Sequence, residues 1–123
     1  MLNIKDVAKY ILVKFEEINS WKLHKLCYYC QVYYYINENT PLFYNVITAW
    51  LNGPVILDLY KICGGKNTLN ANDIDGNINN IGIIEKHYID LVIKKYGQLS
   101  NDRVNYPHLT PSELEVGACK SSS

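Results

Sequence analysis

The stretch from Trp21 to Ile36, WKLHKLCYYCQVYYYI, constrains the fold more than any other part of the chain. Its apolar residues recur at helical spacing, and beyond Cys27 nearly every side of the helix is apolar or aromatic. Such a helix must be covered by the rest of a domain or by a membrane. The stretch is too short, and with its lysines and tyrosines too polar, to span a bilayer. The sequence therefore predicts a central buried helix, with its N-cap at Asn19 or Ser20.

The whole-chain composition limits the fold and the function. A chain of 123 residues has the length of one domain, and a hydrophobic content of 48% argues against disorder. Twelve basic and 12 acidic residues cancel, so no net charge attracts nucleic acid or anionic lipid. The start of the chain has no export-signal pattern, and no apolar run is long enough to cross a membrane. We therefore expect a cytoplasmic protein without a membrane partner.

Around the central helix, the spacing of apolar residues predicts three further helices. They cover residues 6–17, 55–63 and 81–96. Pro54 suits the first position of the second of these helices, and Gly64 suits its end. The buried face of the last helix is expected to consist of Ile84, Tyr88, Leu91 and Val92.

The connections between the helices are polar, apart from one short β element. Runs at 42–44 and 46–51, rich in β-branched and aromatic residues, predict this element. The asparagine-rich loop over 66–80 is expected to be the least structured part. Within 101–123, a strong helix start at Thr110–Glu113 has almost no helix behind it. The predicted fold class is mainly α: a compact single helical domain around a buried central helix, with a small β hairpin.

Residues that could carry chemistry do not form a recognisable catalytic or metal-binding set. Cys27 and Cys30 form a CxxC pair inside a helix, without the second pair that a zinc site needs, so both are expected to pack in the core. His24, His87 and His108 lack a carboxylate or nucleophile at a telling spacing and are expected at the surface or as caps. No nucleophile, metalloprotease or paired-carboxylate motif occurs. We expect no enzyme, no cofactor and no metal site.

Tyrosine is unusually abundant, with 11 in the chain and five in the central helix. These side chains either pack the core with their hydroxyls at its rim or form an interface patch. Lys22 and Lys25 share a face near the start of the helix, and Tyr29 follows Lys25 on the same stripe. We expect this stripe to be exposed and to bind a partner protein. The alternative is that both lysines are solvated or pair with nearby carboxylates.

Several short motifs occur together in this chain. A helix motif spans Trp21–Gln31, a Pro-Leu-Phe follows at 41–43, and Ala49–Val55 is followed by Tyr60. In combination they resemble the Panacea domain family, the SocA-like antitoxins, which are also described as phage-associated proteins. Tyr96–Ser100 resembles a further motif near the end of that domain. The matching positions for which we expect a structural role are Leu23, Leu26, Tyr28, Gln31, Trp50, Gly53, Pro54, Val55 and Tyr60.

The resemblance implies a mainly helical domain over 1–100 and an antitoxin function. Such a protein neutralises a cognate toxin, either by binding it directly or by delivering it to a host protease. Residues 101–123 depart from the family pattern and are expected to be a divergent or truncated segment. We expect Trp50 to be buried against the central helix.

Two alternatives remain open at this point. The first is a phage-encoded inhibitor of a host or defence protein, built on the same domain. The second is a small nucleic-acid-binding domain or an uncharacterised enzyme that uses the face bearing tyrosine and lysine.

Overall fold

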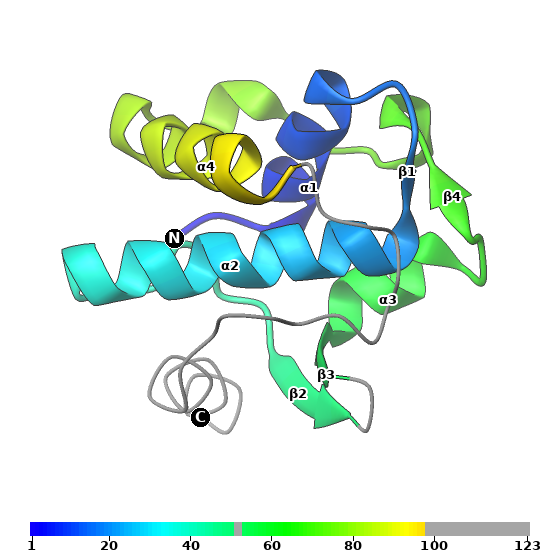
Figure 1. Ribbon diagram of the computed structural model, residues 1–123, viewed down its shortest axis with the longest axis horizontal. Coiled ribbons are helices and arrows are strands. Elements are labelled where there is room, and N and C mark those ends of the chain that lie inside the picture. Colours follow the sequence, from blue (N-terminus) through cyan, green and yellow to red (C-terminus); the bar gives the residue numbers. More distant parts are fainter. Residues whose placement is uncertain (51–52, 98–123) are drawn as a thin grey trace.

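The computed structural model describes residues 1–50 and 53–97 (Figure 1). Its α-helices are α1 (Ile4–Lys14), α2 (Ser20–Glu38), α3 (Leu57–Cys63) and α4 (Ile83–Tyr96). Its strands are β1 (Ile18–Asn19), β2 (Ile47–Trp50), β3 (Gly53–Ile56) and β4 (Thr68–Leu69), and its 3-10 turns are η1 (Ala71–Asp73) and η2 (Ile78–Asn80). Strands β2 and β3 form an antiparallel hairpin, and β1 pairs with β4. The predicted mainly helical fold with a small β hairpin is confirmed.

Helix α2 is the axis of the fold. Figure 1 shows α1 and α4 on one side of it and the β2–β3 hairpin with α3 on the other. The helix begins where the Asn19 side chain accepts a hydrogen bond from Trp21 N, and it ends at Asn39, whose φ is 60°. All residues over 23–32 are buried. The prediction of a central buried helix is therefore confirmed.

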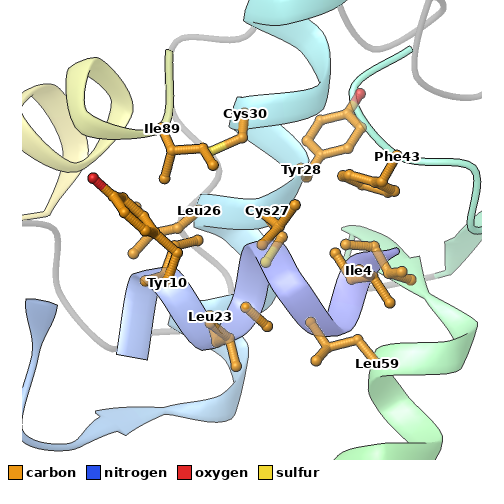
Figure 2. Packing of buried hydrophobic residues seen from close by; sticks show 14 of the residues in the cluster. Ile4, Tyr10, Leu23, Leu26, Cys27, Tyr28, Cys30, Phe43, Leu59 and Ile89 are labelled. Atoms are coloured by element: carbon orange, nitrogen blue, oxygen red, sulfur yellow. The ribbon is translucent and has the colours of Figure 1, made fainter. Parts of the chain in front are cut away.

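Both faces of α2 contribute to one hydrophobic core. Figure 2 shows Cys30 beside Ile89 of α4 and Tyr28 beside Phe43. Cys27 and Cys30 are fully buried, which confirms the core position predicted for the CxxC pair. Burial raises the pKa of both thiols, so they stay protonated at neutral pH and pack as small apolar groups.

Buried polar side chains fix the connection from α2 to β2. The Oε1 atom of Gln31 accepts a hydrogen bond from Leu42 N at 2.7 Å, and its Nε2 donates one to Phe43 O at 3.0 Å. The Asn45 side chain accepts a hydrogen bond from Ile4 N at 2.7 Å. The connection is thereby tied to both α2 and α1, and it places the hairpin.

The asparagine-rich segment over 66–80 is more ordered than its composition predicts. It contains β4, η1 and η2, and the side chains of Asn70 and Asn77 cap the two turns. The buried Asp6 of α1 accepts hydrogen bonds from Asn77 N at 2.9 Å and from Asn80 Nδ2 at 3.2 Å. The expectation of a weakly structured loop is wrong, because asparagine side chains supply the hydrogen bonds that tight turns leave open.

The third helix begins later than predicted. Pro54 and Val55 belong to β3, where they pair with Ala49 and Thr48 of β2. The helix starts at Leu57 instead, so the assignment of Pro54 to its first position is wrong. Proline is compatible with this place because the hairpin has only two strands and both are edge strands.

Helix α4 buries a different face from the predicted one. Ile89, Val92 and Tyr96 are buried, whereas Ile84 and Leu91 are exposed. Of the four residues predicted to be buried, Val92 is buried as expected. The helix carries two apolar stripes at similar spacing, and the contact with α2 decides which one is buried.

Two sequence-based expectations, the domain boundary near residue 100 and the helix start at Thr110–Glu113, lie outside the described residues. Within the described residues, no helix combines the length and hydropathy required to cross a membrane.

Candidate surface for partner binding

The stripe predicted to bind a partner lies mostly inside the protein. Lys25 and Tyr29 are 0% exposed, while Lys22 remains partly exposed. The reason is that α1, α4 and β3 all pack against α2, so the side opposite α1 is also covered. The ring of Tyr29 contacts that of Tyr96 in α4, with 4.5 Å between their centroids. The expected exposure of Lys25 and Tyr29 is wrong, and a partner contact by Lys22 stays a prediction.

The motif residues of α2 lie in the core. Leu23, Leu26 and Tyr28 are buried, and Figure 2 shows them in the hydrophobic cluster. Gln31 is also buried, and its amide bonds to the backbone of the connection that leads to β2. This half of the motif therefore holds the fold together.

The motif residues of the hairpin and α3 are divided between core and surface. Val55 is buried, and Gly53 has a φ of 122°, which favours glycine at the start of β3. Trp50 pairs with Gly53 at the end of the hairpin and is 40% exposed, and Tyr60 of α3 is 49% exposed. The expectation of a buried Trp50 is wrong, because the other end of the hairpin, at Ile47, enters the core.

Trp50 and Tyr60 form one continuous aromatic surface. Their rings meet edge to face, with 5.0 Å between centroids and an interplanar angle of 66°. This is a favourable geometry for an aromatic pair. Two elements, β2 and α3, thus present two large aromatic side chains side by side to solvent. We call this pair the Trp50–Tyr60 surface.

A pocket of about 210 Å³ opens beside Tyr60. The start of α2, the end of α3 and the link to β4 form its walls. Ser20 N donates a hydrogen bond to Asn67 O at 2.8 Å, and Gly64 and Gly65 turn the chain with positive φ. The pocket is therefore built from fixed backbone. It is lined by Ser20, Trp21, His24, Tyr60, Cys63, Gly65, Lys66 and Asn67.

His24 is the buried polar side chain of this pocket. It is 3% exposed, and its Nδ1 accepts a long hydrogen bond from Ile56 N at 3.4 Å. Burial lowers the pKa of His24 to about 4, so the imidazole is neutral at pH 7. The expectation of a surface or capping histidine is wrong. The sequence contained one signal for the burial of His24, namely its position in a helix that is apolar on nearly every side. The contact of His24 with β3 could not be predicted, because it depends on the tertiary structure.

The arrangement offers binding groups. An exposed aromatic pair adjoins a small pocket that contains a neutral imidazole. In the part of the chain that the structure describes, no three His, Cys, Asp or Glu side chains lie close enough together to hold a metal ion.

Comparison with known proteins identifies the family. A family model described as "Antitoxin SocA-like, Panacea domain" matches residues 23–109. The match begins in α2 and includes the hairpin, α3 and α4. No curated protein and no solved structure matches the chain. Because the family model covers most of the sequence, the chain belongs to the SocA-like antitoxin family that is defined by the Panacea domain.

Proposed function

We propose that this protein is an antitoxin that neutralises a cognate toxin in the cytoplasm by binding it through the Trp50–Tyr60 surface. Membership of the family supports an antitoxin-like role with a protein partner. The exposure of two neighbouring aromatic side chains supports this particular surface. The bound toxin is either blocked directly or delivered to a host protease.

The composition of the surface favours it over other exposed apolar residues. Tryptophan and tyrosine are enriched among the residues that dominate binding energy at protein interfaces. A second apolar patch, at Ile83 and Ile84 of α4, is more exposed but aliphatic, and it lies outside the motif residues. The Trp50–Tyr60 surface therefore has the chemistry expected of an interface centre.

The fold also holds the two rings in place before any partner arrives. The backbone of Trp50 is held by its pairing with Gly53 in the hairpin, and its ring packs against that of Tyr60. Tyr60 projects from α3, whose neighbouring residues Leu59 and Cys63 are anchored in the core. A surface ordered in advance loses little conformational entropy on binding, which favours affinity.

Growth rescue tests the proposal in cells that express a candidate cognate toxin. The double variant Trp50→Ala/Tyr60→Ala is expected to lose rescue and to bind the purified toxin at least about 30-fold more weakly, since truncating two interface aromatics costs roughly 2 kcal/mol or more. The matched control is Ile83→Ala/Ile84→Ala, which removes two exposed apolar side chains elsewhere. The control is expected to rescue fully.

Full rescue by a folded Trp50→Ala/Tyr60→Ala protein contradicts the proposed surface. The host background separates the two forms of the proposal. Rescue that disappears in a protease-deficient host while binding persists indicates delivery to the protease, and rescue that persists indicates direct neutralisation. Specific binding of a host or defence protein in place of the toxin supports an inhibitor built on the same domain.

A further inference from the structure

The pocket beside Tyr60 has a chemistry of its own that toxin binding does not require. We propose that it binds an uncharged planar molecule carrying a carbonyl oxygen, with Nε2 of His24 donating a hydrogen bond to that oxygen. The proposal goes beyond the antitoxin function, and its test needs no partner protein.

The hydrogen-bond donor follows from the contacts of His24. Its Nδ1 accepts a hydrogen bond from Ile56 N, so in the neutral ring the proton is on Nε2. No further hydrogen bond of this side chain is formed within the described residues, and the ring lines the pocket. Because the ring lines the pocket, its N–H group is available to a molecule that enters, and a ligand carbonyl is a suitable acceptor.

The shape of the pocket favours a flat ligand. Trp21 and Tyr60 provide aromatic walls, and the Trp21 and His24 rings lie 6.2 Å apart. A cavity of roughly 150 Å³ accommodates benzene in another protein. The volume here, about 210 Å³, therefore has room for one aromatic ring with a small polar substituent.

The charges around the pocket favour a neutral ligand over an anion. Among the described residues, Lys66 is the one formally charged residue in the lining, and its Nζ lies 2.6 Å from Asp73 Oδ1. That carboxylate cancels the lysine charge. Burial, with a further contribution from Asp73, raises the pKa of Cys63 to about 11, so this wall is also uncharged at pH 7. A carboxylate in the pocket would lose hydration without gaining an unpaired cation.

Benzamide and benzoate test the proposal as an isosteric pair that differs in charge. Each is titrated at pH 7 into the full-length protein labelled with ¹⁵N, and backbone amide shifts are followed by NMR. Benzamide is expected to shift the amides of Trp21, His24 and Asn67 selectively. Benzoate is expected to bind at least about tenfold more weakly, because the described lining residues offer no unpaired cation to offset its desolvation. Equal or tighter binding of benzoate, or benzamide shifts that are absent or spread over the surface, overturns the proposal.

Two substitutions of His24 test the donor. His24→Asn can still accept the hydrogen bond from Ile56 N but is too short to place a donor at the Nε2 position, whereas His24→Gln can reach it. We expect the Asn variant to bind benzamide about tenfold more weakly than the wild type and the Gln variant to retain most of the affinity. Unchanged affinity in a folded Asn variant overturns the role of His24. If that variant does not fold, toluene is titrated into the wild-type protein instead. Toluene has a shape similar to that of benzamide but lacks the carbonyl. Toluene binding as tight as benzamide binding overturns the proposal.

Discussion

The two halves of the family motif lie in opposite surroundings. On α2, Tyr28 and Gln31 are buried and contact the core and the backbone of a neighbouring segment. On the hairpin and α3, Trp50 and Tyr60 contact each other and solvent. A buried aromatic ring stabilises a fold through the area it removes from water, whereas an exposed ring contributes much less to folding and is available for binding. One motif therefore contains residues that hold the fold and residues suited to recognition.

The sharpest test of this contrast is the loss of a buried ring. Tyr28→Ala is expected to lower the free energy of unfolding by about 3–5 kcal/mol, because a large side chain leaves a cavity in the core. Chemical denaturation followed by circular dichroism measures the change. Tyr28→Phe is the control and is expected to lose only about 1 kcal/mol, since the ring stays. An Ala variant as stable as the wild type would remove the distinction between the two halves.

The next effect depends on pH and concerns His24, which lies where the two regions meet. Burial lowers its pKa to about 4 in the folded protein, while in the unfolded chain the value is about 6.5. The unfolded state therefore binds the proton first as the pH falls. The contribution of neutral His24 to stability is complete above pH 6.5 and is lost progressively down to pH 4, by an amount on the order of 3 kcal/mol.

Denaturation of the wild type and of His24→Gln at pH 7 and pH 4.5 measures this effect. The other titrating groups are common to both proteins, so the difference between them isolates His24. The wild type is expected to lose more stability than the variant over this range. Equal losses in both proteins would show that His24 titrates near its ordinary pKa.

A smaller loss is expected at Gln31. Gln31→Ala leaves the buried backbone groups of Leu42 and Phe43 without their side-chain partner, which we expect to cost about 2–3 kcal/mol in the free energy of unfolding. Asn37→Ala is the matched control, because its amide lies on the same helix and donates an exposed hydrogen bond to Tyr33 O. The control is expected to change stability by less than about 0.5 kcal/mol. Similar losses in both variants would contradict a special role for the buried amide.

The smallest stability effect is expected at the surface. Trp50→Ala should lower the free energy of unfolding by no more than about 1 kcal/mol, although it removes a larger side chain than Tyr28→Ala does. Thermal and chemical melts of the purified variant measure it. A loss comparable to that of Tyr28→Ala would show that Trp50 holds the fold, and it would weaken the case for the Trp50–Tyr60 surface.

The elements were largely predictable where local chemistry decides them. The asparagine at position 19 caps α2, the glycine at position 64 ends α3, and the apolar character of α2 requires burial, so these features follow from the sequence. The same reasoning failed at Lys25, because a helix with one polar side is ordinarily exposed on that side. Here β3 packs against α2 in addition to α1 and α4, and Lys25 is buried.

The candidate site was less predictable than the fold. The sequence identified Trp50 and Tyr60 as motif residues, but the expected burial of Trp50 was wrong. The direction of a side chain at the end of a hairpin depends on the register of the two strands and on where the hairpin leaves the core. His24 became a pocket residue for a similar reason, since Ile56 comes from a strand more than thirty positions away.

The sequence by itself determined the family through the combination of its short motifs. It also determined the mainly helical class and the central helix, because composition, periodicity and capping act over a few neighbouring residues. The tertiary structure alone decided which stripe of α4 is buried, why Lys25 is inside and why the Trp50–Tyr60 pair is outside. These outcomes depend on how distant elements dock around α2. Two apolar stripes or two faces of a helix can look equivalent in sequence, and only the neighbour that packs against one of them makes them different.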